Sequence, residues 1–304
     1  MEKILTFGHK SPDTDTVCSS ISMAYLQNKL GKEAEAKRLG KINKETKYAL
    51  NYFDVKEPEL LEKVQEAQEV ILVDHNEFTQ SVEGIKNAKI KMVVDHHRIS
   101  NFETTEPLYY IAEPVGCTST ILYGLYKAEN IEIERKIAGL MLSAIISDTL
   151  LFKSPTCTKK DIEVAKKLAT IADVEIEKYG LDMLKAGTDL DDFSEEELVN
   201  LDAKKFERDG VKCVIAQVNT VSIEDVLKRE EKLKKAINKE IEKENLDVFV
   251  LAITDILNSN SELIVLGKRT DVIEKTYSLK DDKVLLKGVV SRKKQLLPLV
   301  ENNI

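Results

Sequence analysis

The chain contains no tryptophan and only four cysteines in 304 residues. The cysteines are scattered and form no Cys-x-x-Cys pair, so the sequence predicts a reduced protein without a disulfide framework. A basic leader followed by an apolar segment is also lacking, and no stretch reaches the roughly 18 to 20 apolar residues of a membrane-spanning helix. We therefore expect a cytoplasmic protein that has no membrane partner.

Positive charge is in short supply as well. The 45 Lys and Arg residues stand against 53 Asp and Glu residues, which gives a formal net charge of -8. A surface that binds nucleic acid has to neutralise phosphates with a basic face. The charge balance therefore predicts no nucleic-acid partner, although a local basic pocket stays open.

Histidine is scarce, and its placement is informative. The chain has four histidines, and each lies beside aspartate in a short cluster that follows a run of apolar residues. The clusters are His9-Lys-Ser-Pro-Asp13-Thr-Asp15, Asp74-His75-Asn76 and Asp95-His96-His97, and a fourth acidic cluster is Ser147-Asp148. Mixed imidazole and carboxylate donors suit Mn²⁺, Co²⁺ or Zn²⁺ better than Ca²⁺, which prefers oxygen ligands. The clusters therefore predict a metal site.

The order of the expected elements favours an α/β fold. Short apolar strands at residues 3–8, 70–73 and 90–94 alternate with helical or amphipathic segments at 16–30, 44–53, 58–68 and 77–87. This repeated β-α-β pattern is typical of a mainly parallel sheet flanked by helices. Further helices are expected at 118–128, 134–147, 159–171 and 174–184. They complete an N-terminal domain.

The length of the chain exceeds the size at which a single core stops growing, which predicts a second domain. We interpret the acidic stretch 187–195 as a linker between domains at 1–186 and 196–304. Strands are expected at 211–218, 248–254, 262–266 and 283–286, and one long charged helix at 222–245. The C-terminal domain is therefore expected to be a smaller α/β unit.

The carboxyl ends of parallel strands lie at one edge of a sheet, where ligands bind. The strand ends that carry His9, Asp74 and His96 are therefore expected to meet. A structural alternative is that aspartates such as Asp13 and Asp15 merely cap the next helix. Three converging clusters weaken this alternative, because their negative charges would repel one another without a cation.

Five motifs, taken together, resemble those of the DHH phosphoesterase superfamily, and within it the family II, manganese-dependent inorganic pyrophosphatases. They are Gly8-His-Lys-Ser-Pro-Asp-Thr-Asp-Thr16, Val73-Asp-His-Asn76, Asp95-His-His97, Ser147-Asp-Thr149 and Ser291-Arg-Lys-Lys-Gln295. The resemblance covers essentially the whole chain in the same order. It implies a DHH-type N-terminal domain and a DHHA2-type C-terminal domain.

The resemblance also implies two Mn²⁺ or Co²⁺ ions in each active site, with one carboxylate between them. The implied ligands are His9, Asp13 and Asp74 for one ion, and Asp15, Asp74, His96 and Asp148 for the other. Two such ions can lower the pKa of a shared water and hold the resulting hydroxide in line with phosphorus. Additional Mg²⁺ or Mn²⁺ is expected to arrive with the substrate.

Charge neutralisation on the substrate falls, by the same resemblance, to four basic residues. They are His97, Lys204, Arg292 and Lys293, with Lys205 as the competing candidate for Lys204. The turn before Arg292 is expected to offer free amides to a phosphate. His97 could instead merely pair with Asp95, which we expect to orient an imidazole. His75 and Asn76 have no assigned role.

The implied reaction is hydrolysis of inorganic pyrophosphate to two phosphates, with the substrate bound between two domains of a protein that forms a homodimer through its N-terminal domain. The nearest alternative is an exopolyphosphatase of the same superfamily. A DHH nuclease is disfavoured because the chain has no Gly-Gly-Gly-His segment. A non-catalytic metal-binding protein is disfavoured because every ligand position is present.

Overall fold

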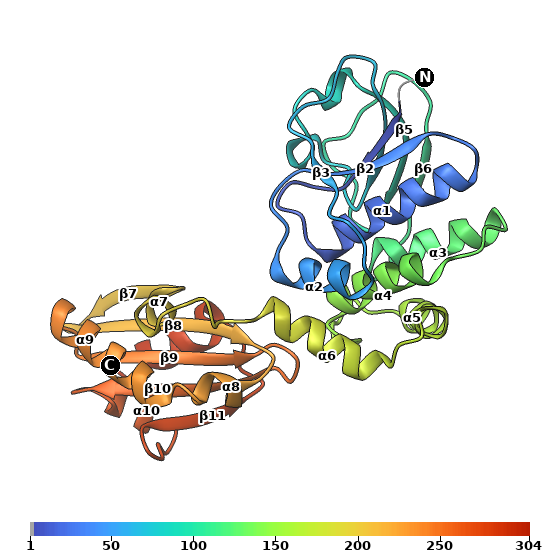
Figure 1. The fold of residues 1–304 in the computed structure, drawn as a ribbon. Coiled ribbons are helices and arrows are strands. Elements are labelled where there is room, and N and C mark those ends of the chain that lie inside the picture. Colours follow the sequence, from blue (N-terminus) through green and yellow to red (C-terminus); the bar gives the residue numbers. More distant parts are fainter. Residues whose placement is uncertain (1–2) are drawn as a thin grey trace. The chain divides into compact units, whose positions relative to one another are not determined.

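The computed structural model describes residues 3–304, so residues 1 and 2 of the expected N-terminal domain lie outside the described residues. The chain forms two compact units, the first ending at Gly187 and the second beginning at Thr188. Each unit contains a sheet and helices, as Figure 1 shows. The α/β fold class with two domains is therefore confirmed.

The first unit is built on a six-stranded sheet in which every strand pair is parallel. Its strands are β1 (Ile4–Phe7), β2 (Ala34–Arg38), β3 (Glu59–Leu60), β4 (Glu69–Val73), β5 (Lys89–Asp95) and β6 (Tyr109–Ala112). The three predicted strands are β1, β4 and β5, which lie at the centre of the sheet. The others lie near the sheet edges and are only partly buried or exposed; β2 is charged and β3 has two residues, whereas the apolar strand β6 was simply missed.

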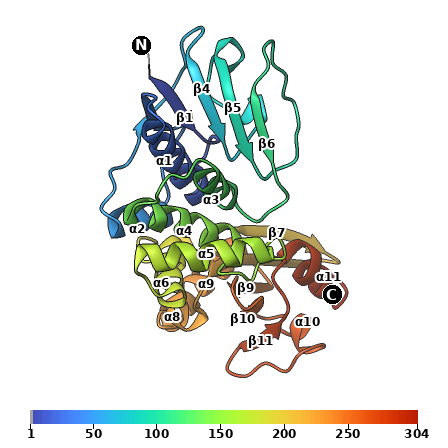
Figure 2. The ribbon, with the colours of Figure 1, turned by 90° about the vertical axis from the view of Figure 1, so that its right-hand side faces the viewer.

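Helices cover one face of this sheet. Helix α1 (Thr14–Lys29) packs on β1 and β4, and α3 (Thr118–Ala128) packs on β5. The remaining helices of the unit are α2 (Lys44–Tyr52), α4 (Arg135–Thr149), α5 (Lys159–Ala172) and α6 (Ile176–Gly187). Helix α4 packs on α1, and α5 packs on α4 (Figure 2). The helices expected at these positions are confirmed, with small shifts at their ends.

Irregular chain covers the opposite face, and this corrects the prediction of helices at 58–68 and 77–87. The first segment contains β3, and the second contains two short 3₁₀ turns, η1 (Phe78–Gln80) and η2 (Ile85–Asn87). Ala67 and Gly84 adopt φ angles of 60° and 86°, and these left-handed conformations are incompatible with a continuous right-handed helix. The apolar side chains that produced the amphipathic pattern pack on the sheet instead, and they are Val64, Phe78, Val82 and Ile85.

The strand order β3-β2-β1-β4-β5-β6 places the site clusters. The direction of successive crossovers reverses between β1 and β4, and ligands of doubly wound sheets bind at the carboxyl ends of strands at such a switch point. The cluster beginning at His9 follows β1, and Asp74 follows β4. The Asp95 cluster ends β5, the neighbour of β4.

The second unit contains a five-stranded mixed sheet of order β11-β10-β9-β8-β7. Its strands are β7 (Ala203–Arg208), β8 (Val211–Thr220), β9 (Val248–Asp255), β10 (Asn260–Gly267) and β11 (Lys283–Lys287). Strands β8 and β9 are parallel, and the other pairs are antiparallel. The four predicted strands are confirmed, whereas β7 was missed because this edge strand is charged and largely exposed.

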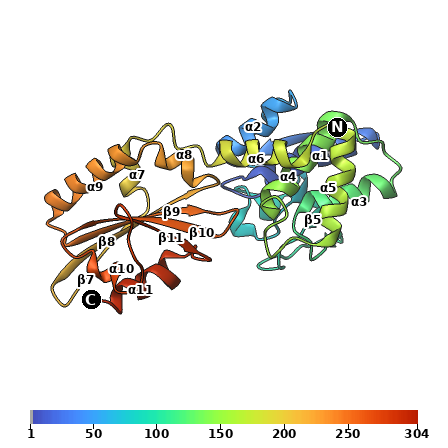
Figure 3. The same ribbon diagram turned by 90° about the horizontal axis from the view of Figure 1, so that it is seen from below.

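Helices lie on both faces of the second sheet (Figure 3). On one face are α7 (Glu195–Asn200), α8 (Ile223–Leu227) and α9 (Glu230–Glu244), and on the other are α10 (Asp271–Glu274), the π-helical turn η3 (Arg292–Leu296) and α11 (Leu297–Glu301). The single helix predicted at 222–245 is wrong, because it is interrupted at Lys228 and Arg229. The Arg229 guanidinium donates to Glu195 and to the carbonyl oxygens of Leu190 and Phe193.

Among residues 3–304, no helix combines the length and the apolar character needed to cross a membrane.

Two helical glycines of the first unit provide a matched test of its packing. A Cβ atom added at Gly139 in α4 would overlap the Phe53 ring, whereas nothing lies within 4 Å of a Cβ added at Gly124 in α3. We expect Gly139→Ala to destabilise the protein by about 2 kcal/mol through overpacking. Gly124→Ala is expected to stabilise it by about 0.5 to 1 kcal/mol through the lower backbone entropy of the unfolded chain. Thermal unfolding of both variants measures the difference, and a Gly139→Ala protein as stable as the wild type would contradict this packing.

Candidate functional site

The loop between β1 and α1 is tightly folded. Gly8 permits a close approach to Thr16, because an added Cβ would lie 2.5 Å from the Thr16 Cγ2 atom. Asp13 caps α1, since its Oδ1 atom accepts a hydrogen bond from the Thr16 amide at 2.9 Å. Its other oxygen, Oδ2, lies 3.3 Å from His9 Nε2. The capping alternative is therefore realised at Asp13, but it leaves one carboxylate oxygen facing an imidazole.

Asp74 lies at the centre of the site. This buried residue follows β4 with a φ angle of 58°, a left-handed conformation that turns the chain sharply out of the strand. Its Oδ2 atom is 3.4 Å from His9 Nε2, and its Oδ1 atom is 3.3 Å from His96 Nε2. Thr16 and Thr118 donate hydroxyl hydrogen bonds to the same carboxylate at 2.6 and 3.2 Å. Asp74 is thus shared by the first and third clusters.

Three overlapping groups of potential ligands result. His9, Asp13 and Asp74 form the first group; Asp15, Asp74, His96 and Asp148 form the second; Asp74, His96 and His97 form the third. Within each group, ligand atoms contributed by the members lie within 4.8 Å of one another. The first and second groups are the ones that the family resemblance implies. Asp148, in the last turn of α4, joins Asp15 from the first turn of α1 and the residues Asp74 and His96 that follow β4 and β5.

The ionised carboxylates of the second group repel one another and are costly to bury without a cation. Burial, together with the charge of Asp74, raises the pKa of Asp15 to about 6. Burial and the charges of Asp15 and Asp74 also raise the pKa of Asp148 well above its usual range. Burial likewise opposes ionisation of Asp74, but hydrogen bonds with His9 and His96 hold its pKa below the usual range. The site therefore needs positive charge.

Without a metal, the two imidazoles provide that charge. Burial opposes protonation of His9, but its contacts with Asp13 and Asp74 raise its pKa to about 11. Burial also opposes protonation of His96, but its contacts with Asp74 and Asp15 raise its pKa to about 9. Divalent ions would replace these protons, since a metal binds the neutral imidazole. Mixed nitrogen and carboxylate donors around one shared carboxylate fit a pair of borderline divalent cations such as Mn²⁺.

The other members of the clusters support the site from outside. His97, whose side chain is 52% exposed, pairs through Nδ1 with Asp95 Oδ1 at 2.9 Å, so Asp95 orients this imidazole. Asp95 also accepts a hydrogen bond from Asn76 Nδ2 at 2.6 Å. His75 is buried, and its ring nitrogens face the Val73 carbonyl oxygen and the Ser81 hydroxyl. His75 and Asn76, which sequence reasoning left without a role, therefore hold the framework.

Sequence reasoning missed several hydroxyl residues that hold the carboxylates. The Ser19 hydroxyl donates to Asp15 at 2.6 Å, and the Thr118 amide donates to the same carboxylate at 2.7 Å. Glu45, a partly buried carboxyl whose pKa is raised by burial, accepts from the hydroxyls of Thr14 and Ser147. Ser19 lies one turn after Asp15 and could have been found by helical spacing. Thr118 had no local signal, because it is remote in sequence.

In the second unit, the predicted basic segment is held by side chains rather than left open. Arg292 pairs through Nη1 with Asp202 Oδ2 at 2.8 Å. The expectation of free amides before Arg292 is wrong, because Gln295 Oε1 accepts from the amides of Val290 and Ser291, each at 3.0 Å. Lys293 is exposed in the following turn. The segment thus presents cationic side chains, not backbone donors.

The pairing register of β7 separates Lys204 from Lys205. Lys205 pairs with Glu244 at 2.8 Å, on the sheet face that carries α9. Lys204 lies opposite Ile215, which belongs to the apolar cluster on the other face together with Leu296 of η3. Lys204, rather than Lys205, therefore shares a face with the Arg292 segment.

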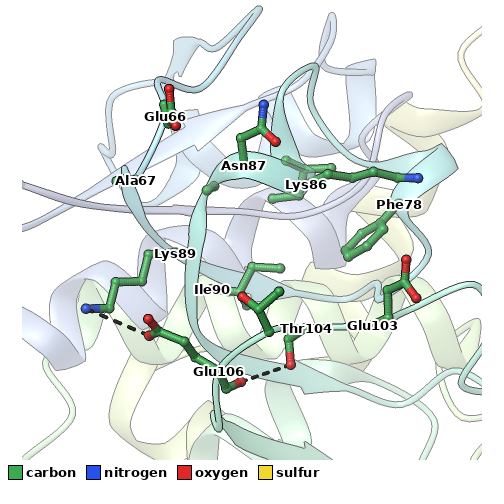
Figure 4. Close-up of a pocket in the computed structure, with 13 residues that line it drawn as sticks. Glu66, Ala67, Phe78, Lys86, Asn87, Lys89, Ile90, Glu103, Thr104 and Glu106 are labelled. Carbon is green, nitrogen blue, oxygen red and sulfur yellow. Dashed lines mark hydrogen bonds and ion pairs between the residues drawn. The ribbon is translucent and has the colours of Figure 1, made fainter.

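A depression of about 630 Å³ lies elsewhere on the first unit, between the turns 66–67 and 85–90 and the segment 103–106 (Figure 4). Lys89 and Glu106 form an ion pair across it at 4.0 Å. None of the predicted site residues lines this depression. It is therefore separate from the ligand groups.

Two family models match the chain. The model of the DHH family, N-terminal domain, matches residues 3–145, and the model of the DHHA2 domain matches residues 181–303. The solved structure of a putative family II inorganic pyrophosphatase of Methanococcus jannaschii is 40% identical with a TM-score of 0.63, covering 100% of this chain and 99% of that one. An exopolyphosphatase-related protein from Bacteroides fragilis has a TM-score of 0.51, covers 99% of this chain and 91% of that one, and is 14% identical, so it shows the fold alone.

Relatives with similar sequences agree over their whole lengths. The manganese-dependent inorganic pyrophosphatase of Bacillus subtilis (strain 168) is 57% identical over 303 residues, which cover 99% of this chain and 98% of the relative. A probable manganese-dependent inorganic pyrophosphatase of Bacillus velezensis is also 57% identical, over 100% of this chain and 99% of the relative. The chain therefore belongs to the family of manganese-dependent inorganic pyrophosphatases and carries a DHH domain followed by a DHHA2 domain.

Proposed function

We propose that this protein hydrolyses inorganic pyrophosphate to two phosphates at a dinuclear manganese site in its first unit. The observation that carries the proposal is the position of Asp74, whose two carboxylate oxygens face His9 and His96 at 3.4 and 3.3 Å. A carboxylate shared in this way can bridge two cations. Membership of the family supports manganese as the metal, and Co²⁺ has the same ligand preferences.

The proposed ligands follow the first and second groups of the site. His9, Asp13 and Asp74 would hold one ion, and Asp15, Asp74, His96 and Asp148 the other. When bound, the ions would supply Lewis acidity and lower the pKa of a shared water that attacks phosphorus. The hydroxyl and amide donors around Asp15 and Asp74 would keep these carboxylates ionised and correctly oriented.

Four basic residues are proposed to bind the substrate and stabilise charge on the departing phosphate. They are His97, Lys204, Arg292 and Lys293. Because Nδ1 of His97 faces Asp95, its Nε2 atom is the one offered to a phosphate oxygen. Preorganised cations of this kind lower the barrier to phosphoryl transfer chiefly through electrostatic stabilisation. Residues of both units would thus act on one pyrophosphate, which would bring an additional Mg²⁺ or Mn²⁺.

We further propose that residues 1–186 and 196–304 are the functional domains, that 187–195 acts as the linker, and that the protein is a cytoplasmic homodimer formed through the first domain. An acidic linker without a regular apolar pattern suits relative movement of the domains during turnover.

Substrate choice is tested by phosphate release from pyrophosphate, tripolyphosphate, long polyphosphate and a short oligonucleotide, each with Mn²⁺ and with Mg²⁺. We expect pyrophosphate with Mn²⁺ to be hydrolysed fastest, because the four proposed basic residues can neutralise a small anion, whereas the net charge of -8 disfavours a long polyanion. Faster release from long polyphosphate would favour an exopolyphosphatase. Release from none of these compounds by the Mn²⁺-loaded protein would contradict the proposal.

Replacement of Arg292 tests the role of the second unit. In Arg292→Ala we expect kcat/KM for pyrophosphate to fall by roughly 10²-fold or more, because a fixed cation that faces the substrate is lost. Bound manganese, measured by atomic absorption, is expected to stay unchanged, since all proposed ligands belong to the first unit. The matched control is Lys294→Ala, two residues away in the same turn and exposed. Equal loss of metal in Arg292→Ala would show that the division of roles is wrong.

Asp148→Asn tests whether the site depends on cations for its stability. The pKa of Asp148 is raised in the fold, so above its unfolded pKa the ionised group opposes folding. At pH 8 and without metal, we therefore expect this variant to melt at a higher temperature than the wild type. With Mn²⁺ the order is expected to reverse, because binding to the native state stabilises it. Calorimetry measures the melting temperatures with and without Mn²⁺. Asp182→Asn, at an exposed position of α6, serves as the control. If Mn²⁺ did not reverse the order of the two melting temperatures, the site would not depend on cations in this way.

A further inference from the structure

A short backbone segment, Val115–Thr118, contacts three of the proposed ligands of the second group. The Val115 carbonyl oxygen faces His96 Nδ1 at 3.1 Å. The Thr118 amide donates to Asp15 Oδ2 at 2.7 Å, and the Thr118 hydroxyl donates to Asp74 Oδ1 at 3.2 Å. The two end residues of this four-residue segment therefore contact ligands that come from three separate parts of the chain.

These contacts decide how the ligands can bind a metal. A carbonyl oxygen can only accept, so the contact with Val115 places the proton of neutral His96 on Nδ1 and leaves the lone pair on Nε2. That Nε2 atom is the one that faces Asp74 and Asp148, at 3.3 and 3.7 Å. The Thr118 amide fixes one oxygen of Asp15 in the same way. The segment thus orients the second group and does not touch His9 or Asp13 in the described hydrogen bonds.

The segment is itself anchored by Asp161, a fully buried residue in the first turn of α5. Its Oδ2 atom accepts from the Gly116 amide at 2.9 Å, and its Oδ1 atom accepts from the Thr120 hydroxyl at 2.6 Å. The contact at Gly116 leaves no spare room, because an added Cβ would lie 2.9 Å from Asp161 Oδ2 and 3.0 Å from Thr149 Cγ2. Thr149 directly follows Asp148, so the fourth ligand adjoins the same contact.

Helix capping does not account for all of these contacts. Asp161 forms a capping box with Thr158, whose amide and hydroxyl both donate to Asp161 Oδ2, at 2.7 and 2.6 Å. The bonds to Gly116 and Thr120 are additional, and they join α5 to the start of α3 rather than to its own first turn. The Asp161 carboxylate therefore caps α5 and also holds the Val115–Thr118 segment, which contacts the proposed ligands.

We propose that Asp161 is a positioning residue that sets the affinity of one metal site, the one made by Asp15, Asp74, His96 and Asp148, through the Val115–Thr118 segment. This inference rests on the proposed dinuclear site. Loss of an outer contact that orients a ligand typically weakens metal binding by about 10- to 100-fold. The site made by His9, Asp13 and Asp74 should be affected less, because the segment contacts only one of its members, through the Thr118 hydroxyl on Asp74 Oδ1, whereas His9 faces Asp74 Oδ2.

Asp161→Asn tests the proposal, since an amide has nearly the same shape but can accept with only one of its two terminal atoms. Mn²⁺ is titrated calorimetrically into the metal-free, full-length protein, and His9→Ala identifies which binding class belongs to the first group. We expect the second class to weaken tenfold or more in Asp161→Asn and the first class to change less than threefold. Wild-type affinity of both classes would overturn the proposal.

Two further variants separate positioning from stability. Gly116→Ala keeps the Asp161 charge and its cap but displaces the segment, so we expect the same selective loss of the second class, and this variant decides the matter if Asp161→Asn does not fold. Thr158→Ala removes a capping hydroxyl and leaves the bonds to Gly116 and Thr120, so a lower melting temperature with unchanged Mn²⁺ affinity is expected. If Thr158→Ala weakened the second class as strongly, or if both classes weakened together in Asp161→Asn, the role would be merely structural.

The readout is Mn²⁺ affinity, so it is independent of the reaction. A wild-type protein that binds two classes of Mn²⁺ but does not hydrolyse pyrophosphate would contradict the proposed function and leave the role of Asp161 testable. A wild-type protein with no second class of Mn²⁺ would overturn this inference directly.

Discussion

Mutual repulsion among the carboxylates of Asp15, Asp74 and Asp148 is the constraint on which the first unit depends. Burial and neighbouring charge raise the pKa of Asp15 and of Asp148, while the imidazoles of His9 and His96 keep Asp74 ionised. Such a group is held together only if cations, or protons in their place, balance it. The features that look unfavourable for stability are therefore those that suit the site to binding divalent cations.

The surrounding structure holds this charge in one geometry. The switch point between β1 and β4 brings the first two clusters together, and α4 delivers Asp148 from the helical layer. Hydroxyl and amide donors then fix individual oxygens, most directly those of Thr16 and Thr118. Asp161 extends this support one step outward. Two of the proposed ligands, Asp15 and Asp148, thus lie on helices, while the others lie in the turns that follow β1, β4 and β5.

The second unit uses a different strategy for its cations. The Arg292 guanidinium pairs with Asp202, and Gln295 satisfies the amides that would otherwise be open to an anion. Charge is therefore carried by side chains, with Arg292 in an ion pair, and not by a backbone nest. A phosphate bound by Arg292, as proposed, would have to compete with Asp202 for the guanidinium.

The sequence by itself determined the fold class, the central strands and most helices, and it predicted the members of the first and second ligand groups, because buried apolar runs, helical periodicity and clustered motifs are local signals. Prediction from the sequence failed where the local pattern of apolar residues does not reveal which structure buries them. The segments around Val64 and Val82 are amphipathic because they cover a sheet as turns, and β7 is charged because it is an edge. Only the tertiary structure showed that Lys204, and not Lys205, shares a sheet face with the Arg292 segment, and only it disclosed the contacts of Asp161. The partners of these residues are distant in sequence, and no local pattern records contacts that form across the fold.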